Sequence, residues 1–528
     1  MSAIPVSTAT TRGAAAVTPH GLATRAALDV MGAGGNAVDG AIAANAVLGM
    51  VLPTTCGIGG DLFAIVHEPG ATAPAILNAS GRGGSGLDAT DLRARGHRRM
   101  PPRSPASVTV PGCVDGWFAL AERFGSRPMD EVLAPAVAFG REGFPASVEL
   151  SEALGRIREM VADQASAPPL YPGGEPPEPG ETLRRPSLAG VLADVGTRGR
   201  NAFYTGRVGR AISTATGGVV SPDDLAGNRP DWVEPLGIDL FGRRAWTVPP
   251  NSQGYVTLAA AWILERLGWS TDPDDPAFHH AVVEAYRAAA WDRDDLVADP
   301  DHLERPVEEL LSEDRLEPRL RALSAEGTAR WPVPPADPGG TAYFCTIDAS
   351  GLAVSCIQSN FMGIGSGLSA ADTGVWLHNR GAGFSLVTDH PNEAAPGKRP
   401  LHTLAPTLWT RDGSVDLLLG TRGGHQQPQY LLQAIARLFV AGQDPADAQR
   451  GPRWSMAFDD VGPGSVLAAE ARMPEGVVAG LVARGHRVDP GPDLPPGWGP
   501  VSIISIGADG TRSAAADPRV SSAEAAGD

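Results

Sequence analysis

The sequence has few cysteines, and none of them belongs to a paired motif. Its 528 residues include only Cys56, Cys113, Cys345 and Cys356, with no CxxC pair and no zinc-ligand spacing. This scarcity argues against a disulfide-stapled secreted scaffold and is typical of reduced thiols in a cytosolic protein. Cys345 and Cys356 fall on two neighbouring predicted strands and could face each other, as packed thiols rather than as a bridge.

Long apolar runs and basic clusters are also missing. No apolar stretch is long enough to cross a bilayer, and the N-terminal stretch MSAIPVSTATTRGAAAVTPHG lacks the charged and apolar regions of a secretory signal. The net charge of −17, without any Lys/Arg run, argues against a nucleic-acid partner. We therefore expect a cytoplasmic protein with neither a membrane nor a nucleic-acid partner.

Several common catalytic signatures are absent or incomplete. GAGGNA at 32–37 partly fits a dinucleotide-binding loop, but it follows a predicted helix, and no acidic residue comes about 20 positions later. No GxSxG elbow accompanies a strand–turn–helix pattern. His279 and His280 lie on a predicted helix without i, i+4 spacing between them, so we expect no metal site there. These absences weigh against a nicotinamide oxidoreductase and a metal-dependent enzyme.

What is present is the pattern of a large mixed α/β protein. The composition, 42% hydrophobic and 20% charged, is that of a soluble globular chain with a sizeable core. Helices and strands in mixed order, with hairpins near the C-terminus, predict packed antiparallel sheets covered by helices. The expected helices span 21–35, 36–53, 255–268, 279–296, 306–324 and 429–442, the expected strands 56–68 and 72–84, and the expected hairpins 342–360 and 500–517.

Residues 334–348, PPADPGGTAYFCTID, place a turn directly before a predicted strand that begins at Thr341. Pro338 fixes φ, and Gly339 and Gly340 tolerate dihedrals that other residues avoid. AYFCTID has the aromatic and β-branched content of a buried strand. Taken alone, this junction is a loop entering a strand.

The stretch GGTAYFCTIDASGLAVSCIQSNFMGIGSG resembles the start of the small subunit in the γ-glutamyltranspeptidase family of N-terminal nucleophile (Ntn) hydrolases. The resemblance implies an αββα sandwich, made as one precursor and split into a large-subunit segment (1–340) and a small-subunit segment (341–528) of one interlaced unit. Further blocks occur in family order along nearly the whole chain: AGGNAVDGAIAANAVLGMVLPTTCGIGGDLFAIV, SVTVPGCVDGW, FYTGRVGRAI, HHAVVEAYRAAAWDRDDLVADP, PGKRPLHTLAPTL, LGTRGGHQQPQ and GADGTRSAAADPR.

The resemblance assigns the chemistry to a few positions. It implies that the chain cuts itself at Gly340–Thr341. Thr341 then supplies the nucleophilic hydroxyl, and its freed α-amino group, with a pKa of about 7.7, supplies the base. Ser359 falls where the family has a second threonine bonded to the nucleophile. Gly423 and Gly424 match the diglycine whose backbone N–H groups form the oxyanion hole. Without the resemblance, Ser359 is a polar strand residue and the diglycine a turn.

The carboxylate side of the substrate pocket departs from the family pattern. Members that act on γ-glutamyl compounds hold the α-carboxylate with an arginine in the loop after the early strand. That slot falls on Ser80 in this sequence, with Arg82 two residues later. Both residues are therefore candidates for substrate binding.

The side that would receive an ammonium group departs further. Arg380 replaces an amide or acid, Gly383 replaces an aspartate, and His402 and Thr403 stand where the family has two serines. A pocket that gains arginine and loses aspartate should repel an ammonium group and attract a carboxylate. The pattern is closer to the acylase-like and amidohydrolase-like members.

We therefore expect an autoprocessed amide hydrolase or acyltransferase that works through an acyl-Thr341 ester on a small-molecule amide, without a metal or organic cofactor. It should favour a carboxyl-bearing acyl group of the glutaryl or oxalyl type. Two alternatives stay open: a true γ-glutamyltransferase or glutathione hydrolase, and an unprocessed homologue that keeps the fold as a binding protein. A homo-oligomer of the processed heterodimer is open as well.

Overall fold

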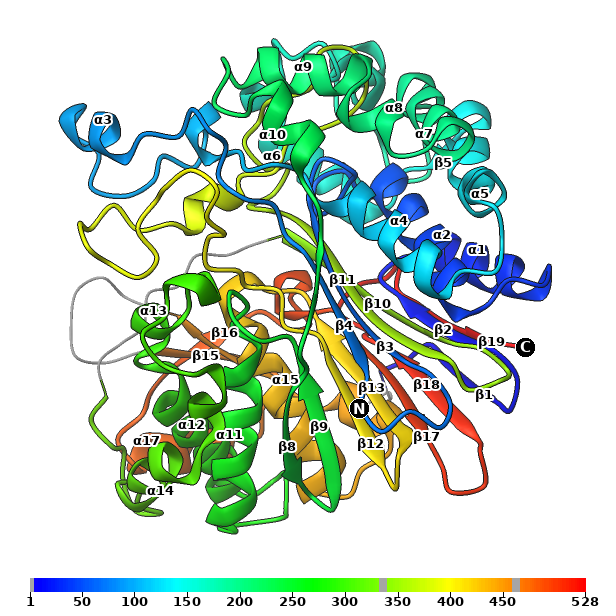
Figure 1. The fold of residues 1–528 in the computed structure, drawn as a ribbon. Coiled ribbons are helices and arrows are strands. Elements are labelled where there is room, and N and C mark those ends of the chain that lie inside the picture. The colour runs from blue at the N-terminus through cyan, green and yellow to red at the C-terminus, as the bar shows by residue number, and fades with distance from the viewer. Residues whose placement is uncertain (1–3, 332–339, 458–465) are drawn as a thin grey trace.

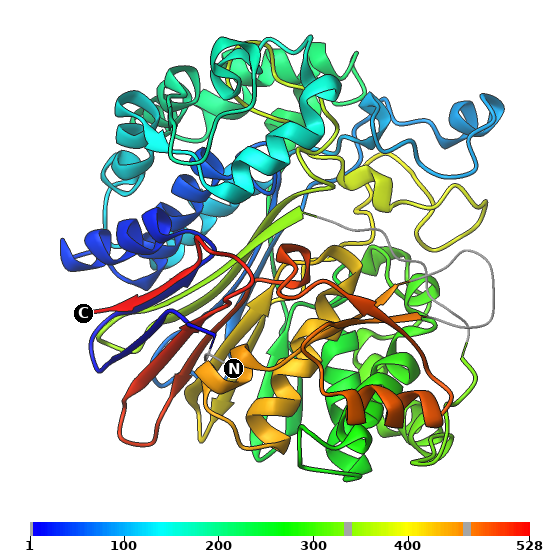
Figure 2. The same cartoon turned by 180° about the vertical axis from the view of Figure 1, so that it is seen from behind.

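Two seven-stranded sheets lie face to face between two layers of helices in the computed structural model, which describes residues 4–331, 340–457 and 466–528 (Figures 1 and 2). This arrangement confirms the predicted αββα sandwich. In spatial order, the first sheet contains β1 (Thr8–Thr11), β18 (Arg512–Ala516), β17 (Val501–Ile506), β13 (Ser414–Thr421), β12 (Thr407–Arg411), β9 (Arg243–Thr247) and β8 (Leu236–Leu240), and the second contains β19 (Glu524–Gly527), β2 (Ala15–Thr18), β10 (Gly340–Ile347), β11 (Ala353–Phe361), β3 (Asp61–His67), β4 (Ala75–Ala79) and β7 (Asp231–Val233).

The helices divide between the outer faces of the two sheets, and each set closes its own hydrophobic core. A third core lies between the sheets. The second sheet is covered by α1 (Gly21–Gly32), α2 (Ala37–Val51), α4 (Cys113–Phe124), α5 (Met129–Glu142), α6 (Val148–Val161), α7 (Pro186–Arg198), α8 (Asn201–Tyr204) and α9 (Arg207–Ala215), and the first by α11 (Gly254–Leu267), α12 (Pro276–Ala290), α14 (Glu313–Arg321), α15 (Gln427–Ile435) and α17 (Glu475–Ala483).

The remaining elements are short and peripheral. A small three-stranded sheet lies beside the helices that cover the first sheet. A two-stranded sheet lies among the helices that cover the second. These elements are α3 (Ala89–Ala94), α10 (Pro222–Gly227), α13 (Arg293–Leu296), α16 (Pro445–Arg450), β5 (Phe144–Pro145), β6 (Thr182–Leu183), β14 (Trp454–Ala457), β15 (Val466–Glu470) and β16 (Arg487–Gly491).

Local chemistry explains the first two helices. The side chain of Asn36 accepts hydrogen bonds from the N–H groups of Val38 and Asp39, and Asp39 returns a bond to the Asn36 N–H, which forms a capping box at the start of α2. Gly40 of α2 lies where any side chain would press on Met31 of α1. The absence of a side chain at Gly40 therefore lets α1 and α2 pack closely.

Both sheets take strands from both sides of the Gly340–Thr341 bond. β1, β8 and β9 of the first sheet and β2, β3, β4 and β7 of the second precede it, and the other strands begin at or follow it. The two chain ends also meet, because the Asp528 N–H donates to the carbonyl of Ala14 over 3.0 Å. Neither segment has a complete sheet of its own.

The central strand β10 points its alternate side chains to two different layers. Tyr343, Cys345 and Ile347 belong to the core between the sheets, whereas Ala342 and Phe344 face the helices. The same period of two directs Thr341 toward the space between the sheets, at the upstream end of the strand.

The pairing register separates the two cysteines that the sequence suggested could face each other. Cys345 lies opposite Ser355, and Cys356 lies opposite Phe344. Neighbouring residues of a strand point to opposite faces, so Cys345 lies between the sheets and Cys356 lies under the helices. That expectation was wrong, although all four cysteines are free and buried.

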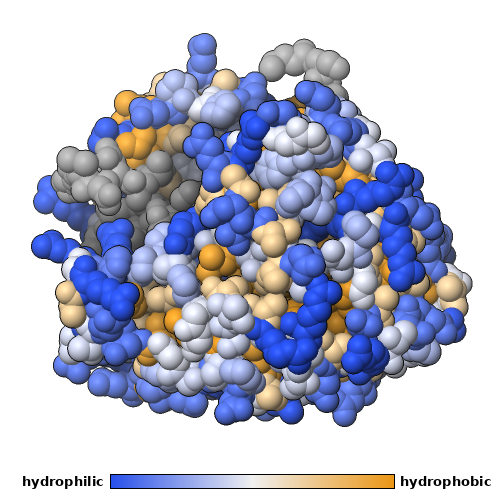
Figure 3. All heavy atoms as spheres, turned by 90° about the horizontal axis from the view of Figure 1, so that it is seen from above, coloured by the Kyte–Doolittle hydropathy of each residue, from blue (hydrophilic) through white to orange (hydrophobic). Residues whose placement is uncertain are grey.

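In the described part of the chain, no helix has the length and apolarity needed to cross a membrane. Seen from above, the molecule shows hydrophilic side chains interspersed with small hydrophobic patches (Figure 3). The cytoplasmic location stays a prediction.

The contact between the sheets below the Thr341 site depends on Gly420, and we expect Gly420→Ala to destabilise the fold. A β-carbon there would overlap the ring of Tyr343, whose hydroxyl is bonded to Ser355 over 2.9 Å and cannot easily move. Overpacking of this kind costs about 1–3 kcal/mol, measurable by urea unfolding. Gly190→Ala is the control, because Gly190 is exposed on α7 with open space around it. Equal unfolding midpoints for the two variants would contradict the prediction.

Candidate functional site

Thr341 and Ser359 form a hydroxyl relay across β10 and β11 in the uncut chain. The Thr341 hydroxyl donates to Ser359 Oγ over 3.2 Å, and the Ser359 hydroxyl donates to the carbonyl oxygen of Gly340 over 2.6 Å. The Phe361 N–H holds Ser359 Oγ from a third direction at 2.7 Å. Ser359 thus touches both the hydroxyl and the carbonyl that flank the Gly340–Thr341 bond.

An irregularity of the backbone produces this arrangement. The pairing of β10 with β11 shifts by one residue between Gly340 and Ala342, so that a bulge lies beside Thr341. Phe361, at the end of β11, has a φ of 72°, which is uncommon for an aromatic residue. Such strained positions cluster at functional sites.

A glycine loop faces the same bond across a cleft. The cleft has a volume of ≈ 480 Å³ and is lined by Gly340, Gly363 and Gly423 among others. Gly423 and Gly424 have φ values of 129° and 57°, which only glycine adopts readily. Within the described residues, neither of their backbone N–H groups donates to a protein acceptor. This loop therefore offers two unused donors near Gly340.

Two side chains fix the glycine loop. Gln253 donates from Nε2 to the carbonyls of both Gly424 (3.0 Å) and Thr403 (2.9 Å), and so ties the loop to the segment that carries Thr403. Arg422, next to Gly423, is buried in an ion pair with Glu149 and in bonds to the carbonyls of Gly499 and Pro496. Arg422 is thereby engaged in the structure of the loop.

Arg380 is a buried cation with unused donors. Its side chain is 0% exposed, its guanidinium lies 3.8 Å from the centre of the Phe361 ring, and Nη1 donates to Thr403 Oγ1 over 3.3 Å. Among the residues that the structure describes, Nε and Nη2 have no hydrogen-bond partner. Burial lowers the pKa of Arg380 to about 9, against the opposing effect of Asp61, so the group stays charged at neutral pH. A buried charge with free donors is costly unless an anion joins it.

A buried carboxylate and two imidazoles lie behind Arg380. His402 Nε2 donates to Asp61 over 3.0 Å, and His378 Nδ1 lies 3.4 Å from the same oxygen. Burial raises the pKa of Asp61, but the contacts with both histidines outweigh it and hold the pKa well below the usual range. Burial and the charge of Arg380 lower the pKa of His402 to about 3. His402 is therefore a neutral donor that secures Asp61.

Gly383 has no room for the aspartate that the family pattern would place there. A β-carbon on Gly383 would lie 2.5 Å from the carbonyl oxygen of Leu401. The carbonyl of Gly383 also accepts a 2.6 Å bond from Asn392, which fixes the backbone. The backbone of this loop therefore excludes an aspartate side chain at Gly383.

Ser80 and Arg82 are held by other partners. Ser80 Oγ donates to Asn78 over 2.7 Å. Arg82 forms 3.2 Å ion pairs with Asp231 and Asp299, and lines a different cavity of ≈ 650 Å³. The structure therefore groups Thr341, Ser359, Arg380 and Thr403 through shared contacts and engages Ser80 and Arg82 elsewhere. The catalytic and binding roles of all these residues stay predictions.

Four residues of this neighbourhood were missed by sequence reasoning. They are Asp61, Gln253, Phe361 and His378. Asp61 and Phe361 lie inside motifs that the sequence does mark, the glycine turn before β3 and the end of the hairpin, but their roles depend on contacts with distant segments. Nothing local distinguishes Gln253 or His378.

Comparisons with known proteins agree on one family over nearly the whole chain. The profile of the family described as Gamma-glutamyltranspeptidase matches residues 23–527. The glutathione hydrolase-like YwrD proenzyme of Bacillus subtilis is 34% identical over 512 residues, which cover 95% of this chain and 96% of that protein. The oxamate amidohydrolase proenzyme of Klebsiella pneumoniae is 32% identical over 520 residues, which cover 97% and 98%. The crystal structure of cephalosporin acylase from Bacillus halodurans matches with a TM-score of 0.90 at 32% identity, covering 98% and 96%.

Proposed function

Because this chain belongs to the gamma-glutamyltranspeptidase family and is an amide-bond hydrolase of the Ntn type, we propose that it cleaves its own Gly340–Thr341 bond. We further propose that the enzyme then cleaves amides whose acyl group carries a second carboxylate. The buried, partly unpaired guanidinium of Arg380 carries the proposal about the substrate.

The hydroxyl relay supports self-cleavage. Thr341 Oγ1 attacks the carbonyl carbon of Gly340 as its proton passes to Ser359 Oγ and the proton of Ser359 passes to the carbonyl oxygen, which avoids a free negative charge on that oxygen. The C–N bond then breaks, the hydroxyl proton of the tetrahedral intermediate moves to the nitrogen of Thr341, and Gly340 remains as an ester on Oγ1. Water hydrolyses this ester and leaves a free α-amino group on Thr341.

Turnover repeats the same bond changes on an external amide. The α-amino group of Thr341 accepts the hydroxyl proton, Oγ1 attacks the substrate carbonyl, and the leaving amine receives the proton. The N–H groups of Gly423 and Gly424 stabilise the oxyanion from across the cleft. Water, or an acceptor amine, then takes the acyl group from Thr341.

The acyl group is selected by charge in this proposal. A carboxylate can accept the unused Nε and Nη2 hydrogens of Arg380 as a bidentate pair. The ammonium group of a γ-glutamyl substrate would instead meet this guanidinium without the aspartate that Gly383 replaces. The oxamate amidohydrolase name of one relative supports a carboxylated acyl class, because oxamate is itself an amide with a carboxylate.

A true γ-glutamyl hydrolase is the second candidate. The relatives named glutathione hydrolase favour it, at 27% identity for the Bacillus subtilis proenzyme. Asp61, fully buried and negative, is the residue that would have to compensate the ammonium group.

Self-cleavage predicts two fragments of the purified protein. The smaller fragment should begin Thr-Ala-Tyr-Phe and contain 528 − 340 = 188 residues. Thr341→Ala should remain one chain because it lacks the hydroxyl, whereas Thr341→Ser should still be cut. Intact mass and N-terminal sequencing check this. Cleavage of the alanine variant at the same bond in a protease-free preparation would sink the idea.

The oxyanion role predicts a sharp effect of Gly424→Ala on turnover. We expect the added methyl group to turn the Gly424 N–H group away from the oxyanion, so kcat of the processed enzyme should fall by about 100-fold. Gly442→Ala is a matched control, because Gly442 has a similar φ of 66°, has open space around it and lies outside the site. If both variants lose activity equally, backbone strain rather than the oxyanion explains the loss.

The charge argument predicts that glutaryl anilides are hydrolysed better than γ-glutamyl anilides. An ammonium group unpaired beside a guanidinium costs several kcal/mol, so the ratio of kcat/KM should reach a factor of about a thousand. Arg380→Ala should reduce this preference, and Arg95→Ala, at an exposed arginine paired with Asp91, should leave it unchanged. A preference of the wild-type enzyme for the γ-glutamyl anilide would favour the second candidate.

A further inference from the structure

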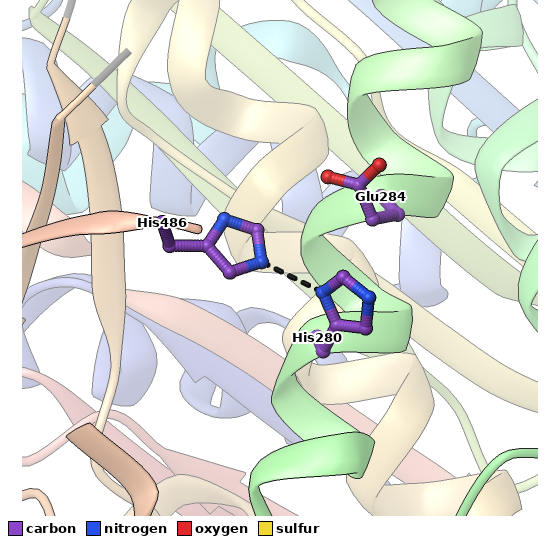
Figure 4. A group of neighbouring side chains, drawn as sticks. All are labelled: His280, Glu284 and His486. Carbon is purple, nitrogen blue, oxygen red and sulfur yellow. Dashed lines mark hydrogen bonds between the residues drawn. The ribbon is translucent and has the colours of Figure 1, made fainter. Parts of the chain in front are cut away.

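Three side chains that suit a metal ion meet on the side of the molecule covered by the α11–α17 helices. His280 and Glu284 lie one turn apart on α12, and His486 follows α17 (Figure 4). One ligand atom from each lies within 4.8 Å of the others, and all three residues are buried. The sequence prediction considered only the adjacent pair His279 and His280, and it missed the i, i+4 spacing from His280 to Glu284.

We propose that His280, Glu284 and His486 form a binding site for a divalent transition-metal ion, with Zn²⁺ the best match. Two imidazoles and one carboxylate are a common donor set for Zn²⁺, with a fourth position left for water. The site is separate from the Thr341 relay and from Arg380, and it is independent of the proposed substrate.

The surroundings of His280 prepare it as a ligand. Its Nε2–H donates to the carbonyl of Ser324 over 2.9 Å, which leaves Nδ1 unprotonated and directed at His486. Metal-binding histidines usually have this second hydrogen bond, which fixes the tautomer. Trp269 stacks on the ring at 5.0 Å and holds its plane.

A hydrogen bond now occupies the place of the ion. His280 Nδ1 and His486 Nε2 are 2.7 Å apart, whereas two nitrogens on one tetrahedral Zn²⁺ at about 2.0–2.1 Å each lie roughly 3.3 Å apart. Binding therefore requires His486 to move outward by about half an ångström. The ring proton of His486 would move from its Nε2 to its Nδ1, so both imidazole rings would stay neutral.

Two hydrogen bonds already fix the carboxylate of Glu284. One oxygen accepts from Arg287 over 2.8 Å and the other from the Ala329 N–H over 2.7 Å. Each oxygen keeps a second lone pair for a metal. The positive charge of Arg287 competes with the ion, so we expect weaker binding than at a cysteine-based zinc site.

The position of the cluster indicates a structural role. His280 and Glu284 precede the Gly340–Thr341 bond and His486 follows it, so one ion would join the two segments after cleavage. The same two residues hold Ser324 and Ala329, in the stretch that leads toward that bond. An ion bound here would stabilise the processed heterodimer.

Titration of the purified, chelator-treated protein with ZnCl₂ tests the site. Calorimetry should give one Zn²⁺ per chain, and Tm should rise with Zn²⁺ concentration. His486→Gln should abolish both effects, and its amide N–H can still donate to His280, which preserves folding. His302→Gln is the control, since His302 is exposed and outside the cluster, and it should bind as the wild type does.

Two results would overturn the proposal: no Zn²⁺ uptake by the wild-type protein, or equal uptake by wild type and His486→Gln. If His486→Gln does not fold, Glu284→Gln replaces it in the same comparison. Loss of Zn²⁺ uptake in Glu284→Gln would support the proposed site, and unchanged Zn²⁺ uptake would refute it.

Discussion

The proposed chemistry depends above all on one buried charge. Arg380 has no exposure to solvent and rests on the Phe361 ring, and within the described ranges only one of its nitrogens forms a hydrogen bond. Proteins seldom keep a cation in this condition unless an anion completes it. Asp61 supplies part of the opposing charge, but its oxygens are already bonded to His402 and to the N–H of Gly81. In the proposed reaction, these free donors bind the carboxylate of the substrate.

The fold brings this charge to the bond that the chain would cut. Ser359 lies opposite Asp61 in the sheet and reaches Thr341 across the neighbouring strand. Phe361 comes two residues after Ser359, and its ring packs against the guanidinium of Arg380. One strand, β11, thus connects the relay to the charge. Because both sheets contain strands from both segments, cleavage would leave this framework intact.

Much of the framework is predictable from the sequence, for local reasons. Helical periodicity and a capping box mark α2, and a glycine turn with aromatic and β-branched flanks marks the β10–β11 hairpin. The short strands β1, β2 and β19 escaped prediction because Ala- and Thr-rich segments of this length pair only once their neighbours exist. The predicted helix over 306–324 is a 3₁₀ turn followed by α14, because the side chain of Ser312 caps a new start.

The site was predictable only where a motif is local. Thr341, Ser359 and the diglycine stand in recognisable blocks, whereas Asp61 and His402 meet across 341 residues of sequence. The most direct test of the charge-selection claim is calorimetric titration of the processed enzyme with glutarate and with L-glutamate. We expect glutarate to bind at least about tenfold more tightly, with the difference lost in Arg380→Ala. Tighter binding of L-glutamate would contradict the claim.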